Sequence, residues 1–293
     1  MKKHVFIIGS RGLPAKYGGF ETFVEELVKH QNNKNIKYHV ACQSENSDIP
    51  GEHFEYLGAD CFVIKLPKIG SARVIAYDIL AINAALKYCK KEEIKAPIFY
   101  ILGNTAGGFI GHYANKIHKL GGKLFVNPDG LEWKRTKWAA PIRSYLKFAE
   151  KKMVRYADLI ISDNAGIKEY LTSEYGQVES EVIAYGTEKF KSDLTESETL
   201  VKYKVNDYYL IVGRFVPENN YETLIRAFMK SSTKRDLVII TNHEGNAYFK
   251  ELREKTQFDK DSRIKFVGTV YNQNELRYIR EHAFAYLHGH EVG

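Results

Sequence analysis

Short apolar runs alternate with longer amphipathic segments along most of the chain. The first run, Val5–Ile8, leads through a glycine-rich loop into an amphipathic pattern that begins at Glu21, which predicts a strand, a loop and a helix. The same criteria predict strands at 38–42, 62–66, 97–102, 124–127, 158–162 and 182–184, a polar loop at 43–53, and helices at 74–88, 142–155 and 164–174. This alternation is typical of a parallel α/β sheet, which binds ligands at the carboxyl ends of its strands.

A polar, charged segment at 188–204 separates this series from a second one. The second series predicts strands at 208–212, 237–241, 264–267 and 283–287, and helices at 221–230, 246–256 and 272–281. We therefore expect two α/β domains, 1–187 and 205–293, with 188–204 as the linker. The second series stops one loop after its last strand, so we expect that domain to be incomplete at its C-terminus.

The bulk composition is that of an ordinary globular protein with a basic excess. The 293 residues are 44% hydrophobic, and the net charge is +7. Such a charge favours an anionic partner, either a nucleotide, a nucleic acid or an acidic membrane surface, although it also serves simple solubility. Cys42, Cys61 and Cys89 show no metal-binding spacing and form an odd set, which fits a reducing cytosol. No apolar run is long enough for a membrane span.

A basic, aromatic segment follows the strand at 124–127. It contains both tryptophans and continues into an amphipathic pattern rich in lysine and arginine, which favours a helix at an anionic membrane interface. The residues expected to contact the membrane are Lys134, Arg135, Lys137, Trp138, Arg143 and Lys147. The alternative is a core-packed helix with a solvated basic face. Nucleic acid is a weaker candidate because the chain contains no nucleic-acid-binding module.

The glycine loop before Glu21 is a candidate ligand-binding loop. Gly18 and Gly19 allow close approach of a phosphate, and Glu21 either orients a ligand or favours the positive end of the helix dipole. An ordinary βα turn is the alternative. A nicotinamide or flavin site is not indicated, because the glycines do not form G-x-G-x-x-G and no acidic residue ends the second strand at the expected spacing.

Four ordered segments resemble the GT-B glycosyltransferases of family 4. They are the opening Gly18-Gly19-Phe20-Glu21 with 24–27, the strand, loop and helix at 208–228, the segment RIKFVG at 263–268, and AFAYLHGHE at 283–291. The resemblance implies an α/β protein of the GT-B fold, with two Rossmann-like domains that face a cleft. Domain 1–187 would bind the acceptor, and domain 205–293 would bind the donor.

The segments NPDGLEWKRTKW at 127–138, SRGLPAKYGGFETF at 10–23 and VPENN at 216–220 resemble a subgroup, the bacterial β-1,4-rhamnosyltransferases. These enzymes move rhamnose from dTDP-rhamnose to a polyprenyl-diphosphate-linked sugar in capsule or cell-wall polysaccharide synthesis. The resemblance implies a retaining hexosyl transfer without cofactor or metal, on the cytoplasmic face of the plasma membrane. The alternatives are a different donor, such as a UDP-sugar, and an inactive nucleotide-sugar-binding fragment.

On the donor side, the resemblance assigns Gly213 and Arg214 to the diphosphate, since a guanidinium makes paired charge-assisted bonds to phosphate oxygens. The family usually carries a lysine where this chain has Asn219. Arg214 would then bear more of the charge, or the backbone N–H groups of Asn219 and Asn220 would replace the lost contact. Gly268 completes the expected donor set.

Two acidic residues are candidates for the chemistry. Asp129 follows a strand end and is expected to position or deprotonate the acceptor hydroxyl, although Pro-Asp-Gly is also a common turn. Glu291 lies near the first acid of the family's paired-glutamate motif, which holds sugar hydroxyls. His288, His290 and Glu291 have weak spacing for a metal site, so we expect none there.

Overall fold

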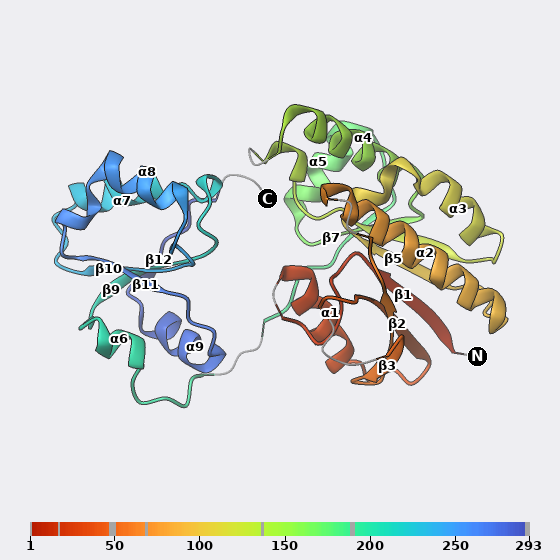
Figure 1. Ribbon diagram of the computed structural model, residues 1–293, viewed down its shortest axis with the longest axis horizontal. Helices are drawn as coiled ribbons and strands as arrows, with labels where there is room; N and C mark the ends of the chain where they lie inside the picture. Colours follow the sequence, from red (N-terminus) through yellow and green to blue (C-terminus); the bar gives the residue numbers. More distant parts are fainter. Residues whose placement is uncertain are drawn as a thin grey trace. The chain divides into compact units, whose positions relative to one another are not determined.

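The computed structural model describes residues 2–16, 18–46, 51–67, 70–135, 138–187 and 191–290. The chain divides into two compact units, one of residues 1–186 and the other of residues 187–292. Each unit has its own largely parallel sheet with helices on both faces (Figure 1).

The first unit is built on an eight-stranded sheet with the order β3-β4-β2-β1-β5-β6-β7-β8. Its strands are β1 Lys3–Ile8, β2 Ile36–Gln43, β3 His53–Tyr56, β4 Ala59–Ile64, β5 Ile98–Leu102, β6 Lys123–Asn127, β7 Leu159–Ser162 and β8 Ser180–Val182. Only β3 runs antiparallel to its neighbour. The strand order reverses between β1 and β5, and such a switch point opens a crevice at the carboxyl ends of the two strands.

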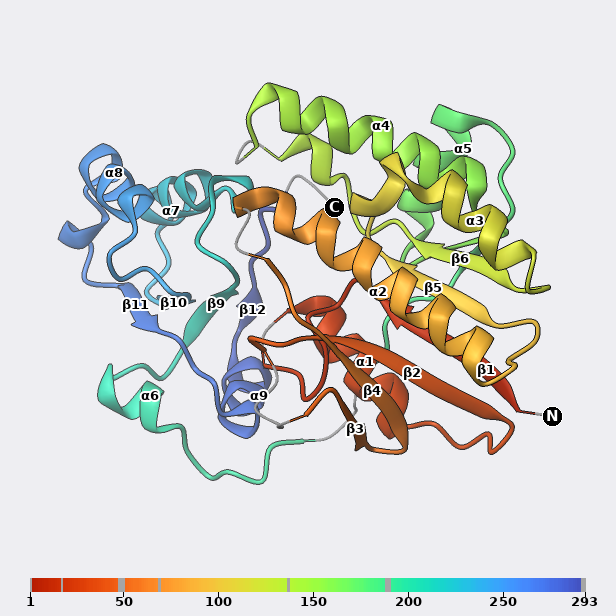
Figure 2. The ribbon, with the colours of Figure 1, turned by 45° about the vertical axis from the view of Figure 1, so that its right-hand side comes forward.

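Helices cover both faces of this sheet, as Figure 2 shows from the side. They are α1 Gly19–Lys29, α2 Arg73–Lys91, α3 Ile110–His118, α4 Ala140–Tyr156 and α5 Ala165–Tyr175, with short 3-10 turns η1 Gly70–Ala72, η2 Thr105–Gly108 and η3 Glu132–Lys134. Alternate residues of β1 point to opposite faces. Phe6 and Ile8 join the core under α2 to α5, and Ile7 joins the core under α1.

The second unit has a parallel four-stranded sheet with the order β11-β10-β9-β12. Its strands are β9 Tyr208–Val212, β10 Asp236–Ile240, β11 Ile264–Gly268 and β12 Ala285–Tyr286. Its helices are α6 Glu198–Lys202, α7 Tyr221–Lys230, α8 Ala247–Thr256 and α9 Gln273–His282, with 3-10 turns η4 Pro217–Asn219 and η5 Phe258–Lys260. Residues of α7 and α8 fill the core on one face, and residues of α6 and α9 fill the core on the other.

The predicted strands and helices are confirmed, with small differences at their ends and three omissions, β3, α3 and α6. Strand β3 begins at the last residue of the segment predicted as a polar loop, and its four residues are only half-buried or exposed and contain no apolar run. Helix α3 buries Ile110, Tyr113, Ala114 and Ile117, a helical spacing that sequence reasoning passed over.

The predicted linker is only partly a linker. Leu200 of α6 is buried in the core of the second unit, and Ser197 and the backbone N–H of Thr199 both donate to the Glu275 carboxylate of α9. The polar composition that suggested a linker reflects this hydrogen bonding at the surface of a folded unit. Residues 192–204 therefore belong to the second unit.

Among the described residues, no helix combines the length and the apolar character that crossing a membrane requires.

Candidate functional site

A pocket of about 220 Å³ lies at the carboxyl ends of β9 and β12 in the second unit. Its lining includes the predicted residues Gly213, Arg214 and Asn219. Arg214 is exposed at the end of β9, and within the described ranges its guanidinium has no ion-pair partner. The pocket is smaller than the roughly 300–1,000 Å³ of a site for a drug-sized ligand, so it suits one part of a larger molecule.

The loop around Asn219 is held by side-chain hydrogen bonds. The Asn219 amide nitrogen donates to the Arg214 carbonyl oxygen at 2.6 Å, and its amide oxygen lies 2.7 Å from Nδ1 of His290. Asn220 has a left-handed backbone, with φ of 52°, and donates from its side chain to the Gly289 carbonyl oxygen at 2.7 Å. These bonds tie the loop after β9 to the loop after β12.

The backbone N–H groups of Asn219 and Asn220, offered as an alternative phosphate contact, already have partners in the structure. The N–H of Asn219 donates to the Val216 carbonyl oxygen, and the N–H of Asn220 donates to the Pro217 carbonyl oxygen. Both donors are consumed inside η4, because the chain turns tightly there to enter α7. Side chains, rather than these amides, must supply polar contacts to a ligand.

Gly268 lies apart from this pocket. It ends β11, which is separated from β9 by β10, and its carbonyl oxygen accepts from the Thr241 N–H. It is not among the residues that line the pocket. Glu291 lies outside the described residues.

The pocket also contains residues that sequence reasoning did not assign to the donor site. Tyr286, His288 and His290 line it from β12 and the loop that follows. Tyr286 donates to the Val212 carbonyl oxygen at 2.8 Å, and the ring centroids of the two histidines are 6.0 Å apart. The sequence feature that could have indicated the two histidines is their alternate spacing directly after β12, the strand that pairs with β9. No group of His, Cys, Asp or Glu in the described ranges is arranged to hold a metal ion.

In the first unit, Glu21 organises the glycine loop. This carboxylate is 6% exposed and accepts a hydrogen bond of 2.7 Å from the backbone N–H of Arg11. Gly18 has φ of 132°, and a Cβ atom there would lie 1.8 Å from Oε2 of Glu21. Gly19 opens α1, and a Cβ atom there would meet nothing within 4 Å. Glu21 therefore restricts the space at Gly18, whereas the space beside Gly19 is unoccupied.

Asp129 lies beyond the carboxyl end of β6. Its backbone is left-handed, with φ of 60°, and its N–H donates to the Asn127 amide oxygen at 2.9 Å. Burial raises the pKa of its carboxyl, opposed by a hydrogen bond from Gly130 and by the charge of Arg135. The residue is a turn residue and also a half-buried acid at the ligand-binding edge of the sheet, so the two sequence interpretations are compatible.

Polar atoms without partners gather around the switch point of the first sheet. Ser10 follows β1, Asn104 follows β5, and Asp78 lies on α2. Each has a buried side-chain oxygen that makes no hydrogen bond within the described part of the chain. Buried polar atoms of this kind are uncommon, and they cluster where a ligand or water completes a site.

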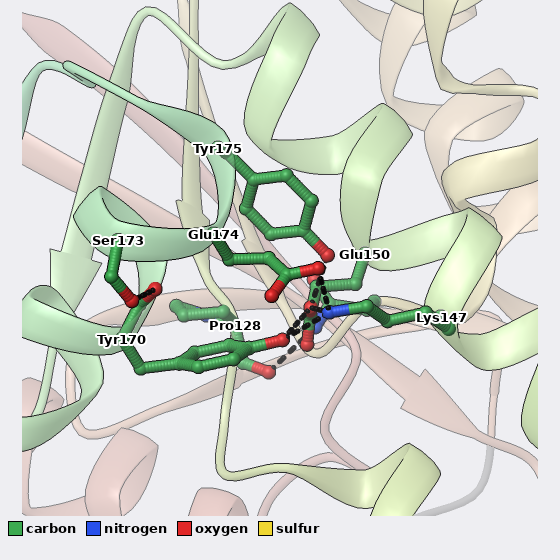
Figure 3. Close-up of polar contacts among 8 residues, drawn as sticks. Pro128, Lys147, Glu150, Tyr170, Ser173, Glu174 and Tyr175 are labelled. Carbon is green, nitrogen blue, oxygen red and sulfur yellow. Dashed lines mark hydrogen bonds and ion pairs between the residues drawn. The ribbon is translucent and has the colours of Figure 1, made fainter.

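Lys147, which was expected to contact a membrane, has acidic partners inside the first unit. It lies inside a cluster formed by α4 and α5, in which the side chains point toward one another (Figure 3). Its ammonium lies 2.9 Å from a Glu174 carboxylate oxygen and 3.4 Å from an oxygen of Glu150, which is 2% exposed. Tyr170 and Tyr175 also donate to Glu150. The basic pattern of α4 therefore includes one cation that neutralises a buried acid.

The other residues expected at the membrane differ in their surroundings. Arg135 pairs with Glu132 at 2.9 Å, and the Trp138 indole donates to the same carboxylate at 2.8 Å. Arg143 is exposed and donates to the Trp133 carbonyl oxygen at 3.0 Å, and Lys134 is exposed. Lys137 lies outside the described residues.

Comparison with known proteins gives one family and a set of similar folds. Residues 2–188 match the family described as "Domain of unknown function (DUF1972)". A search of curated proteins finds no match.

Several of the solved structures that resemble the chain are GT-B glycosyltransferases, and another is described as a putative UDP-N-acetylglucosamine 2-epimerase from Listeria monocytogenes. The chain has the GT-B fold with two Rossmann-like domains. Sucrose-phosphate synthase from Thermosynechococcus elongatus is 15% identical with a TM-score of 0.76, over 97% of this chain and 75% of that one. Anabaena HepE in complex with UDP and glucose is 16% identical with a TM-score of 0.60, over 94% and 71%. An Escherichia coli structure described as "Trehalose-6-phosphate from E. coli bound with UDP-2-fluoro glucose" is 10% identical with a TM-score of 0.62, over 98% and 78%.

Proposed function

We propose that this chain, which belongs to the DUF1972 family and has a GT-B fold, is a glycosyltransferase that uses a nucleotide-diphosphate sugar. The observation that carries the proposal is the pocket at the ends of β9 and β12, which Arg214 lines together with Asn219 and His290. Among the described residues, the Arg214 guanidinium has no ion-pair partner. A departing pyrophosphate needs cationic stabilisation, and a guanidinium provides it with paired hydrogen bonds.

The donor we favour is dTDP-rhamnose, because the segments at 127–138 and 216–220 resemble those of the bacterial β-1,4-rhamnosyltransferases. A UDP-sugar is the second candidate, since the related folds include HepE with UDP-glucose and the E. coli structure with UDP-2-fluoro glucose. The two candidates share the pyrophosphate and differ in the base and the sugar. The chemistry of the pocket around Arg214 is therefore the same for both.

In this proposal the transfer retains the anomeric configuration. Arg214 neutralises the charge that develops on the leaving pyrophosphate, and the leaving phosphate accepts the proton of the acceptor hydroxyl on the same face of the sugar. Asp129 is proposed to orient that hydroxyl. The burial that raises its pKa and its position beyond β6 support this role.

The acceptor we propose is a polyprenyl-diphosphate-linked sugar in capsule or cell-wall polysaccharide synthesis, and the chain would work at the inner face of the plasma membrane as a peripheral protein. The exposed cations Lys134 and Arg143 support contact with an anionic surface, and Phe148 of α4 is 48% exposed. Lys147 plays no part in this contact, because its charge is used by Glu150 and Glu174.

Calorimetric titration with dTDP-rhamnose, UDP-glucose, dTDP and UDP, followed by a transfer assay with a polyprenyl-diphosphate-linked sugar, tests the proposal. The proposal expects tight binding of one nucleotide family and transfer that Asp129→Asn abolishes without loss of donor binding. Binding without transfer, in this chain and in a longer one, would mean a nucleotide-sugar-binding protein. No binding of any nucleotide would overturn the proposal.

A further inference from the structure

The described residues that line the pocket in the second unit have neutral or basic side chains. Arg214, His288 and His290 are its basic groups, and no carboxylate is among the described residues that line it. A pocket of this composition favours an anion. Arg214 projects from the end of β9, whereas the histidines come from the loop after β12, so the basic groups reach the pocket from two sides.

Asn219 fixes the orientation of the His290 ring. A carbonyl oxygen only accepts hydrogen bonds, so the amide group of Asn219 that faces the Arg214 carbonyl is its NH₂. The amide oxygen of Asn219 therefore faces His290, and Nδ1 of His290 is the donor in the contact of 2.7 Å. Nε2 is left for another partner, and within the described ranges it makes no hydrogen bond.

A close backbone approach keeps this arrangement in place. A Cβ atom on Gly289 would lie 2.7 Å from the Asn219 carbonyl oxygen, so only glycine lets the two loops meet at this distance. Asn220 adds its bond to the Gly289 carbonyl oxygen from the other loop. The pairing of Asn219 with His290 is therefore built into the backbone of both loops.

We infer that His290, positioned by Asn219, is a second ligand for the pyrophosphate of the donor, opposite Arg214. This inference rests on the proposed function and adds a residue to it. With Nδ1 bound to Asn219, a neutral ring presents a lone pair at Nε2, which repels a phosphate oxygen. The ring must take up a proton so that Nε2–H can donate, and donor binding is therefore coupled to protonation of His290.

Several ionisable groups lie around this ring. Arg214 and His288 line the same pocket, Tyr221 enters it from α7, and Tyr286 enters it from β12. Glu218 of η4 lies next to Asn219 in the chain and has interactions of its own. An arriving pyrophosphate adds negative charge next to His290, which favours the protonated ring.

Calorimetry with UDP-glucose and dTDP-rhamnose in buffers of different ionisation enthalpy tests the inference. Both probes carry a pyrophosphate diester whose charge is constant near neutral pH, so a net uptake of protons reports on the protein. We expect proton uptake by the wild-type chain. In His290→Gln we expect an affinity that is weaker by roughly 10- to 100-fold, with no proton uptake, because one charge-assisted hydrogen bond is lost. Asn219→Ala should show the same change, and the double variant should be little worse than either single one.

His282→Gln is the matched control, because this histidine lies on α9, is exposed and stacks on Tyr278 outside the pocket. Thermal unfolding of each variant separates loss of affinity from loss of folding. If the wild-type chain binds a nucleotide sugar and His290→Gln binds it equally well, the inference is overturned and the proposed function stands. If His290→Gln loses affinity only for the sugar nucleotides and not for dTDP or UDP, with no proton uptake in the wild type, the ring binds a sugar hydroxyl and the inference also fails. If the wild-type chain binds no nucleotide, the proposed function itself fails.

Discussion

The ammonium of Lys147 lies 4.5 Å from the centroid of the Trp133 ring. The same ammonium neutralises Glu150 and Glu174, and the rings of Tyr170 and Tyr175 lie 5.0 Å from it. Although desolvation lowers the pKa of Lys147, its bonds to Tyr170 and Glu174 raise it above the ordinary value. This contact ties the loop after β6, which carries Asp129, to α4 and α5.

Replacing Lys147 with methionine should destabilise the first unit. The substitution leaves the buried Glu150 carboxylate without its cation, which costs about 2–4 kcal/mol in the free energy of unfolding. Urea unfolding followed by tryptophan fluorescence measures the change close to Trp133. Lys151→Met is the control, because Lys151 is exposed on the same helix, and its effect should stay within about 0.5 kcal/mol. Equal effects of the two variants would show that the cluster carries no stability.

Replacement by alanine should destabilise the protein at only one of the two adjacent glycines Gly18 and Gly19. Gly18→Ala places a Cβ atom against Glu21 at a backbone angle of φ 132°, so we expect a loss of about 1–3 kcal/mol in the free energy of unfolding. Gly19→Ala meets open space at the start of α1 and should be neutral, or stabilising by about 0.5 kcal/mol. Thermal or urea unfolding of both variants is the measurement. A tolerated alanine at Gly18 would contradict the assigned role of Glu21.

Asp78 should make stability depend on pH. Burial raises the pKa of this carboxyl to about 7, opposed by the hydroxyl that Thr105 donates to it. The folded chain keeps this proton up to about pH 7, whereas the unfolded chain releases it near pH 4. The contribution of the protonated Asp78 carboxyl to the free energy of unfolding is therefore fully present below about pH 4 and is lost as pH rises through 7.

Asp78→Asn mimics the protonated acid and removes this dependence. The variant's gain in free energy of unfolding over the wild type should be larger at pH 8 than at pH 5. Urea unfolding of both proteins at both pH values measures this gain. The difference in free energy of unfolding between the two proteins isolates the effect of Asp78, because the other titrating groups are common to both. A difference that does not change with pH would contradict the prediction.

The Arg214 contact should be bidentate. Arg214→Ala is expected to weaken binding of the favoured nucleotide diphosphate by about 1.5–3 kcal/mol, the range for a charge-assisted hydrogen bond. Arg214→Lys keeps the charge and loses the forked geometry, so it should fall between the alanine variant and the wild type. Isothermal calorimetry measures all three. An alanine variant that binds like the wild type would place the pyrophosphate elsewhere.

Membrane binding should depend on the exposed cations alone. Lys134→Glu with Arg143→Glu should reduce co-sedimentation with phosphatidylglycerol vesicles, since each surface cation contributes about 1 kcal/mol. Lys147→Met should bind as the wild type does, because its charge is already paired. Neutral vesicles and added salt are the controls. Binding that ignores lipid charge and salt would count against the membrane proposal.

The elements of the fold could be predicted because their signals are local. The apolar run in β1 and the helical spacing in α7 are visible in a few neighbouring residues, and the structure has both elements where these patterns indicate them. Strand β3 was missed because an edge strand with half-buried residues lacks that signal. The predicted linker at 188–204 is too long, because Ser197 and Thr199 donate hydrogen bonds to Glu275 of the second unit. The polar sequence of this segment does not reveal that it is folded.

The site could be predicted less completely, since its contacts join residues far apart in the chain. Arg214 and Asn219 were indicated by the resemblance to the family 4 glycosyltransferases, and both line the pocket. The partner of Asn219 is His290, 71 residues later, and nothing in the local sequence indicates that pairing. In the same way, Lys147 looks like a surface cation until Glu174 of α5 is brought beside it.

The central claim is that the pocket at the ends of β9 and β12 holds the pyrophosphate of a sugar donor. A crystal structure of the chain with dTDP or UDP, whichever binds more tightly, tests it most directly. The account predicts phosphate oxygens within hydrogen-bonding distance of the Arg214 guanidinium and of Nε2 of His290. A nucleotide bound elsewhere, such as at the glycine loop before α1, would contradict it.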